Sequence, residues 1–472
     1  MKKNKTNKYI FISTLIFIFI FLAMSGYLIY FNVVKAEGII NNPYNKRQNV
    51  LSEKIIRGSI LANDKTPIAV TNIDVNGKET RYYPYANLFS HIAGYLNNGG
   101  YGLERLNCYY MLQSNQNFFE QIGNDLTGRK NYGDNIVTTL DINLQKIAYD
   151  ALGNNRGAVI ISEPSTGKIL AMVSKPDFDP NTLADNWSNI IAPGSDSVLV
   201  NRATQGLYPP GSTFKLVTML EYIRENKATY NSYQYQCNGS YILGNTEINC
   251  LHSTAHGSLN LFSSLGFSCN SSFINIGLKL NMDSYRKTAE ELLFNKELPV
   301  DLEYNKSKFV LTHDSAKWDI AQTACGQGQT LVTPLHLSLI TNAIANNGVL
   351  MNPVIVDHIE NCNGITIKKF KTSTYGTLLN SDESFLLQKG MEEVVSDSFS
   401  WLFTGSNYSI AAKSGSAQYG TQGYEHSLFV SYSPIEKPEI SVTVVIEGGP
   451  QRTTSAAEIA KIIYDGYYSL KK

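Results

Sequence analysis

The hydrophobic pattern of the chain begins with one long apolar run near the amino terminus. Residues Tyr9 to Val34 contain no Asp, Glu, Lys, Arg or His, and four lysines precede them. A helix rises about 1.5 Å per residue, so this run exceeds the roughly 20 residues that cross a ~30 Å hydrocarbon core. We expect a transmembrane helix over residues 9–34, with residues 1–8 in the cytoplasm and the catalytic part outside. The alternative is a cleaved signal peptide, whose apolar core is typically shorter.

Alternating patterns become regular after residue 136. Two β-rich runs, "GAVIISEP" and "ILAMVSKP", flank the turn "STGK" and predict a hairpin, and "SLFVSYSP" and "EISVTVVIEGG" predict two strands near the carboxyl end. Two helices accompany these strands: "INLQKIAYDAL", capped by Asp141, and a last helix that begins with the capping box of Ser455 and Glu458. We therefore expect an antiparallel sheet built from both ends of this region and covered by the terminal helices.

The remaining segments have different patterns. Residues 202 to about 350 are rich in helical periodicity, whereas residues 35–135 mix short strand-like runs with turns such as "LNNGGYGLE" and "IGNDLTGR". The expected organisation is α+β, with a cytoplasmic tail (1–8), a transmembrane helix (9–34), a small mixed pedestal (35–135) and a large carboxyl-terminal domain (136–472).

Composition adds constraints on partners and cofactors. Lys+Arg 40 balance Asp+Glu 40, so no electrostatic argument favours nucleic acid. The six cysteines form no C-x-x-C pair, and no H-E-x-x-H is present, so the sequence predicts no metal site and no cofactor. Cys237 and Cys250 flank a strand–turn–strand pattern centred on Gly244–Asn245 and can form a disulfide in an exported chain; the alternative is that both are free.

The first candidate for chemistry is "YPPGSTFKL", residues 208–216. The Pro-Pro-Gly turn ends the preceding coil and an apolar helical pattern follows, so Ser212 is expected at the start of a helix with Lys215 on the same face. The positive end of the helix dipole favours a developing negative charge on the serine oxygen. Lysine can act as the base only if burial or a second cation lowers its pKa from about 10.4. The alternative is that Ser212 is an ordinary helix cap. The Ser-x-x-Lys pattern alone is weak evidence, because it also occurs at Ser165 and Ser469.

Two further motifs favour the catalytic interpretation. "GFSCNSSF" places Ser268 and Asn270 two positions apart in a short apolar helical segment, where both are costly unless they face a polar cleft. "IAAKSGSAQYG" places Lys413 at the end of a strand-like run, followed by Ser414, Gly415 and Ser416. The alternatives are a solvated loop for Ser268 and Asn270 and an exposed strand end for Lys413. All three motifs in this order are much less expected by accident.

These residues resemble a known family. Ser212-Thr213-Phe214-Lys215, Ser268-Cys269-Asn270 and Lys413-Ser414-Gly415 are similar to the S-x-x-K, S-x-N and K-[T/S]-G signature of penicillin-binding proteins and serine β-lactamases. From about residue 136 onward, "VNRATQGLYPPGSTFK" and "GQGQTLVTPLHLS" also resemble class B penicillin-binding proteins, here monofunctional and without PASTA domains. "RGSI" (57–60) and "GYGLE" (100–104) are similar to fragments of that family's pedestal, although "LANDK" replaces the Asp-Arg and Gly usual after the first.

The resemblance implies a D,D-transpeptidase that cross-links peptidoglycan stem peptides ending in D-Ala-D-Ala and is acylated by β-lactams. It implies Ser212 as nucleophile, Lys215 as general base and Ser268 as proton relay. It further implies substrate binding by Asn270, Lys413, Ser414, Gly415 and Ser416, and a membrane glycosyltransferase as partner. A secreted β-lactamase fits less well, because a membrane helix and a pedestal precede the domain. The alternative from another class is a non-catalytic β-lactam receptor or scaffold of the wall-building machinery.

Overall fold

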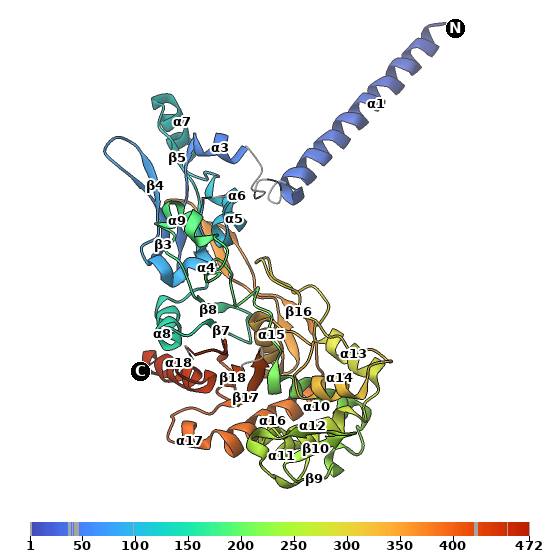
Figure 1. Ribbon diagram of the computed structural model, residues 1–472. Coiled ribbons are helices and arrows are strands. Elements are labelled where there is room, and N and C mark those ends of the chain that lie inside the picture. The colour runs from blue at the N-terminus through green and yellow to red at the C-terminus, as the bar shows by residue number, and fades with distance from the viewer. Residues whose placement is uncertain are drawn as a thin grey trace.

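The computed structural model describes residues 2–35, 39, 41, 47–97, 99–419, 423–450 and 452–471. The long helix α1 (Lys2–Tyr30) continues into a π-helical turn (Phe31–Lys35) and extends away from the body of the protein (Figure 1). Residues Asn7–Tyr30 have a mean hydropathy of 2.3 and are not buried against the rest of the chain. The predicted apolar helix is therefore present, with the length and composition needed to cross a membrane.

The membrane-proximal part contains a six-stranded sheet of order β15-β14-β6-β2-β3-β4. Two of these strands, β14 and β15, come from residues 356–369 rather than from the first 140 residues, so distant parts of the chain build this part together. The strands are β2 (Ile60–Leu61), β3 (Pro67–Ile73), β4 (Glu79–Tyr82), β6 (Asn135–Thr138), β14 (Val356–Glu360) and β15 (Thr366–Lys369). Around them lie α3 (Arg47–Ser52), β1 (Ile55–Ile56), η2 (Ala86–Phe89), α4 (Ser90–Ala93), α5 (Gly102–Leu106), α6 (Cys108–Met111), α7 (Phe118–Thr127) and β5 (Asn131–Tyr132).

A buried ion-pair network joins the two pedestal fragments identified in the sequence. Glu104, from "GYGLE", is fully buried and pairs with Arg57 of "RGSI" at 2.9 Å and with Arg81 at 2.7 Å. Burial disfavours the Glu104 carboxylate, but the charges of Arg81 and Arg57 outweigh it and hold its pKa below the ordinary value. The two fragments therefore meet inside this part of the protein, where their charged side chains neutralise one another.

The large domain is organised around a five-stranded antiparallel sheet of order β17-β18-β19-β7-β8. The first hairpin and the last strands meet in register, with Val159 of β7 opposite Val444 of β19, as the sequence predicted. The strand that carries Lys413 forms one edge. The strands are β7 (Gly157–Ser162), β8 (Ile169–Lys175), β17 (Ala411–Tyr419), β18 (Tyr424–Ser433) and β19 (Ile440–Ile446).

Both faces of this sheet are covered by helices. On one face, the capped terminal helices α8 (Ile142–Leu152) and α18 (Ala456–Leu470) pack on alternate residues such as Val159 and Ile161. On the other face, Ile160 packs in the core that contains α15 (Pro334–Ala345), a helix whose residues are all buried. The caps at Asp141 and Ser455 are those predicted.

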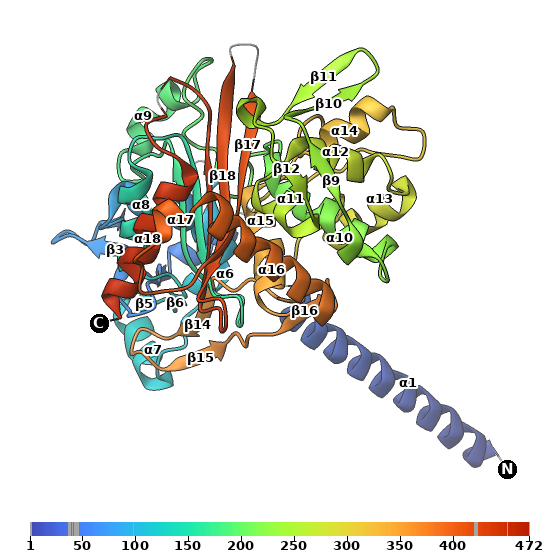
Figure 2. The same cartoon turned by 90° about the horizontal axis from the view of Figure 1, so that it is seen from below.

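The helix-rich block lies beside the β17 edge of the sheet (Figure 2). Its elements include α10 (Lys215–Glu225), α11 (Leu261–Gly266), α12 (Asn270–Gly277), α13 (Met282–Glu291), α14 (Lys317–Ala324) and α16 (Ser381–Ser398). It also holds two small hairpin-like sheets, β9 (Tyr235–Cys237) with β12 (Gly257–Leu259) and β10 (Ser240–Leu243) with β11 (Thr246–Asn249). The other elements are α9 (Leu183–Ile190), η3 (Gly211–Phe214), η4 (Tyr230–Ser232), η5 (Leu251–Ser253), β13 (Val349–Met351), β16 (Thr374–Thr377) and α17 (Ser400–Phe403).

Candidate active site

Ser212 lies where β17 meets the helical block. It belongs to the single 3-10 turn η3, and Lys215 is the first residue of α10. Ser212 therefore lies at the start of a helix as predicted, but the first turn is a 3-10 turn, which is tighter than an α-helical turn. Ser212 is half-buried, whereas Lys215 is fully buried. The preceding Gly211 has φ +55°, and a Cβ there would lie 2.7 Å from the carbonyl oxygen of Ser416. Only glycine lets the serine turn approach strand β17 this closely.

The Lys215 ammonium points to the second motif. Its Nζ donates to the Ser268 carbonyl oxygen at 2.6 Å and to Asn270 Oδ1 at 2.7 Å, and it lies 3.3 Å from Ser268 Oγ. Ser268 is not helical as expected: it joins α11 to α12 with φ +52°, and Asn270 begins α12. This turn aims the Ser268 hydroxyl and carbonyl in the same general direction, toward the buried amine.

Lys413 reaches the same hydroxyl from the sheet. It is the third residue of β17, within the strand rather than at its end as predicted, and it is fully buried. Its Nζ donates to Ser268 Oγ at 3.0 Å and to the Ser414 carbonyl at 3.0 Å. The two lysines, separated by almost 200 positions in the sequence, therefore converge on one serine hydroxyl.

Burial controls the charge of both amines. It lowers the pKa of Lys215, and it lowers the pKa of Lys413 still further, because the Lys215 charge adds to the cost of burial there. A neutral Lys215 amine has two N–H groups, which its two short hydrogen bonds use, and one lone pair that remains for a proton. The physical requirement for Lys215 to act as a base is thus met by desolvation.

The residues after Lys413 form the adjoining edge of the site. Gly415 is buried, and a Cβ there would lie 2.9 Å from the Pro210 carbonyl oxygen, so the strand and the serine turn are in close contact. Ser414 is half-buried and Ser416 is exposed along β17. The Ser416 carbonyl accepts a hydrogen bond from Gln327 Nε2 at 3.1 Å.

Three residues of the site were not selected from the sequence. Gly326 accepts a hydrogen bond from the Gly211 amide at 2.8 Å, and a Cβ on Gly326 would lie 1.6 Å from the Gly211 carbonyl oxygen. The other two lie at the edges of the site. Gln327 Nε2 donates to the Ser416 carbonyl oxygen, and the Asn249 carbonyl oxygen accepts a hydrogen bond from Asn270 Nδ2 at 3.0 Å. The glycines of "GQGQTLVTP" were the sequence signal that could have indicated this contact. Gly211, the partner of Gly326, lies 115 positions earlier, however, and only folding brings the two together.

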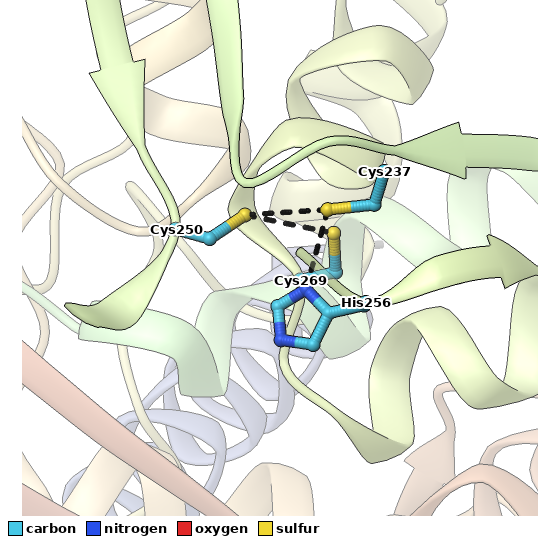
Figure 3. Close-up of side chains that lie close together, drawn as sticks. All are labelled: Cys237, Cys250, His256 and Cys269. Carbon is cyan, nitrogen blue, oxygen red and sulfur yellow. Dashed lines mark hydrogen bonds between the residues drawn. The ribbon is translucent and has the colours of Figure 1, made fainter. Parts of the chain in front are cut away.

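Of the two alternatives for Cys237 and Cys250, a disulfide or two free thiols, the structure has the second (Figure 3). Both are free thiols with their Sγ atoms 3.8 Å apart, beyond the ~2.05 Å of an S–S bond. Both do flank the β10–β11 hairpin as expected. The sequence could not show that Cys269 and His256 would gather at the same point.

A serine turn, two buried lysines and a bridging serine beside an antiparallel sheet define an acyl-transfer serine enzyme of the S-x-x-K type. Known families agree with this class: the family described as the penicillin binding protein transpeptidase domain matches residues 157–465, and the penicillin binding protein A dimerisation domain matches residues 57–136. The first match covers more than half of the chain, which therefore belongs to the penicillin-binding protein transpeptidases.

The similarity to individual relatives extends over most of this chain. The chain is 27% identical over 458 residues to the peptidoglycan D,D-transpeptidase PbpA of Mycolicibacterium smegmatis, covering 90% of each. It is 26% identical over 442 residues to the peptidoglycan D,D-transpeptidase MrdA of Escherichia coli K12, covering 80% of this chain and 69% of that one. The imipenem acyl-enzyme complex of penicillin-binding protein A from M. tuberculosis superposes with a TM-score of 0.80 at 26% identity, covering 89% and 100% of the two chains.

Proposed function

We propose that this protein is a peptidoglycan D,D-transpeptidase that joins stem peptides through an acyl-enzyme on Ser212 and is acylated there by β-lactams. The observation that carries the proposal is the convergence of two lysines on Ser268 Oγ: Lys413, and Lys215, which follows Ser212 by one helical turn. The acyl-enzyme complexes of the M. tuberculosis relative support the same chemistry.

The hydrogen bonds among Lys215, Ser268 and Lys413 support the following proposal for the acylation step. Neutral Lys215 takes the Ser212 proton as the hydroxyl oxygen attacks the penultimate D-Ala carbonyl of the donor peptide. The bond to the terminal D-Ala breaks as Ser268 passes its proton to the leaving amine and takes the proton of Lys215 in exchange, which leaves Lys215 neutral. The backbone N–H groups of Ser212 and Ser416 are proposed to hold the oxyanion, an interaction typically worth about a hundredfold to a thousandfold in rate.

Substrate positioning is assigned to the residues around this centre. Asn270 binds the donor amide and orients Lys215, to which its Oδ1 is already bonded. Lys413 with Ser414, Gly415 and Ser416 holds the substrate carboxylate. Deacylation reverses the roles: an acceptor amine from a second stem peptide attacks the ester and gives a proton to Lys215. The ester C–O bond then breaks, and Lys215 returns that proton to the Ser212 oxygen.

The placement of the chain at the membrane is also a proposal. The apolar helix α1 supports a single-pass anchor, and the lysines before it support a cytoplasmic amino end with the catalytic domain outside the cell. We assign residues 1–8 to the tail, 9–34 to the span, 35–135 to the pedestal and 136–472 to the transpeptidase domain. Because the domain makes cross-links and no glycan chains, a membrane glycosyltransferase is the expected partner.

The test compares two serines that both begin a Ser-x-x-Lys sequence. Ser212→Ala should abolish covalent labelling by a fluorescent penicillin with little change in melting temperature, whereas Ser165→Ala should label like the unmodified protein. Peptide mass spectrometry of the adduct should locate it on the peptide that contains Ser212. Labelling retained by Ser212→Ala would refute the assignment.

A thioester with a D-alanine-like leaving group separates the enzyme from a β-lactam receptor. The enzyme should transfer the acyl group repeatedly to a D-amino acid acceptor. A stable adduct formed once, with no transfer product, would support the receptor instead.

A further inference from the structure

Helix α7 presents its apolar side chains to the outside of the pedestal. Four side chains share this exposure: Phe118 (68%), Phe119 (79%), Ile122 (40%) and Leu126 (83%). None of the ten residues of the helix is buried. At about 100° per residue, the four apolar side chains fall within one arc of about 100° on the helix surface. A surface helix normally turns such a stripe toward the core of its own domain, so α7 has the opposite orientation.

The polar side of α7 attaches the helix to the rest of the pedestal. Gln121 Nε2 donates to the Gln116 carbonyl oxygen at 2.9 Å. Asn131 Oδ1 accepts from Asn124 Nδ2 at 3.0 Å, and Asn131 Nδ2 donates to Asp125 Oδ1 at 3.1 Å. The helix is also capped at both ends. It is therefore a fully formed element, and its apolar arc is exposed because its polar side chains face the body of the protein.

Two neighbouring elements add exposed apolar residues near α7. Val50 of α3 is 54% exposed, and Tyr132 of β5 is 47% exposed. Strand β5 follows α7 and pairs with β1, which follows α3, and Lys130 Nζ donates to the Ser52 carbonyl oxygen at the end of α3 at 2.6 Å. Figure 1 shows α7 and α3 together at one end of the molecule, with the helical block at the other. This end of the pedestal therefore carries exposed apolar residues from three elements.

The chain itself holds the pedestal close to the end of the apolar helix. Asn41 Oδ1 accepts from the Tyr109 amide at 2.8 Å, so residue 41 is bound to α6 of the pedestal. Only five residues, 36–40, separate Asn41 from Lys35, and six backbone steps reach at most about 20 Å. With α1 across the membrane, as proposed above, the pedestal always has a bilayer surface within reach.

The size of the apolar surface favours a bilayer over a second protein. The four side chains of α7 expose on the order of 500 Å² in total, less than the ~800 Å² that each partner contributes to a stable protein interface. A surface this small gives lasting contact only with a partner that is already tethered nearby, because tethering raises the effective concentration. The membrane-spanning helix supplies such a tether to the bilayer.

The chemistry of this surface matches the interfacial region of a membrane. Three of the six exposed apolar side chains are aromatic, and aromatic rings are enriched where the hydrocarbon core meets the headgroups. Lys54 and Arg129 are exposed beside them, and cations at this level favour anionic headgroups. Glu120 projects about 150° away from the centre of the apolar arc. Asp125 accepts from Asn131, so neither carboxylate has to enter the apolar layer.

We propose that α7 lies in the interfacial region of the bilayer, with its apolar arc toward the hydrocarbon core, as a second membrane attachment of the pedestal. Interfacial helices bury such a face ~5–10 Å into the headgroup boundary. The proposal rests on the membrane anchor proposed above and is independent of the acyl transfer. Two attachments restrict rotation of the pedestal about the segment that follows α1. The helical block, at the opposite end of the molecule from α7, is thereby held away from the bilayer (Figure 1).

The first test locates contacts with lipid in the full chain. The protein is reconstituted into vesicles of phosphatidylethanolamine and phosphatidylglycerol that contain a lipid with a photoreactive diazirine in its acyl chain. After irradiation, peptide mass spectrometry should find adducts on α1 and on the peptide that ends at Arg129 and contains α7. The peptide that contains Trp401 of α17, which is 70% exposed at the other end of the molecule, should carry less than a tenth of the α7 adducts.

Paired variants test which surface makes the contact. Phe119→Glu combined with Leu126→Glu should lower the α7 adducts at least tenfold and leave the α1 adducts unchanged. Ile242→Glu is the matched control, since Ile242 is a comparably exposed apolar residue (73%) in the β10–β11 hairpin, and its α7 adducts should equal those of the unmodified protein. The replaced side chains are mostly exposed, so melting temperatures should change little. Labelling of Ser212 by penicillin should be the same in the double variant, which separates this proposal from the catalytic assignment.

The pattern of adducts decides among the alternatives. Adducts on α1, with α7 no higher than the Trp401 peptide, would show that α7 lies outside the bilayer and would overturn the proposal. Protection of α7 from hydroxyl radicals in native membranes but not in these vesicles would then assign its apolar arc to a protein partner. Absence of adducts on α1 would refute the anchor itself, and the second attachment with it.

Discussion

Replacement of Lys413 by methionine tests the electrostatic core of the mechanism. Methionine retains a flexible, largely apolar side chain and removes only the amine, which lies 3.0 Å from Ser268 Oγ. Lys215 Nζ lies 3.3 Å from the same oxygen, so the two nitrogens are at most roughly 6 Å apart. At an effective dielectric constant of ~20, two unit charges at that distance repel by about 3 kcal/mol, or about 2 pKa units.

The direction of the pH effect follows from the role of Lys215. Burial lowers its pKa, and acylation requires its neutral form, so the labelling rate should fall as pH decreases through that pKa. Because the pKa of Lys413 is lowered further than that of Lys215, Lys413 is already neutral when Lys215 takes up its proton, so replacing it removes no repulsion from Lys215. The acid limb should therefore stay at the same pH in Lys413→Met, whereas two charged lysines would move it upward by about 2 pH units, on the scale of the repulsion above.

The assay is the second-order rate constant for labelling by a fluorescent penicillin between pH 5 and pH 10. The maximum rate should also fall, because Lys413 is assigned to the substrate carboxylate, so the midpoint of the acid limb is the informative quantity. Lys168→Met is the control, since Lys168 belongs to a second Ser-x-x-Lys sequence in the hairpin turn. An acid limb that moves upward by about 2 pH units in Lys413→Met alone would refute this order of the two pKa values.

Three further predictions concern the scaffold. Glu104→Gln should destabilise the pedestal by about 3–5 kcal/mol, because it leaves two buried arginines without their counter-charge. The pKa of Glu104 is lowered in the folded protein, so its carboxylate stabilises the fold above about pH 4.5, and this stabilisation is lost as the pH falls through the lower folded pKa. The acid unfolding profile of the variant should lack this pH-dependent loss of stability. Gly326→Ala should reduce labelling and melting temperature together, because its Cβ would collide with the Gly211 carbonyl, and a variant that labels normally would contradict that contact. Ile463→Ala, in the core between α18 and the sheet, should cost about 2–5 kcal/mol in chemical unfolding with labelling kept below the transition.

Much of the large domain was predictable because its signals are local. The alternation of "GAVIISEP" and "EISVTVVIEGG" reflects strands whose two faces contact different helices, and the caps at Asp141 and Ser455 need only a residue three positions away. The family signature likewise identified Ser212, Lys215, Ser268 and Lys413 one by one.

Predictions from short sequence segments were wrong where the conformation of a residue depends on segments far away in the sequence. Ser268 was expected in a helix but lies in a turn at positive φ, since its hydroxyl and carbonyl both face the lysines. Lys413 was expected at a strand end, yet β17 continues to Tyr419 because β18 supplies partners along its whole length. The β14 and β15 strands joined the membrane-proximal sheet although more than 200 residues separate them from its other strands.

The sequence by itself determined the apolar helix, the helices and strands of the large domain and the candidate catalytic residues, because periodicity and motifs are properties of short segments. Only the tertiary structure decided that two lysine amines share one hydroxyl and that three cysteines and a histidine meet beside it. Those residues are separated by 6 to almost 200 positions along the chain. They meet because the folding of the helical block and its packing against the sheet edge bring these segments together in space, a condition that no short stretch of chain contains.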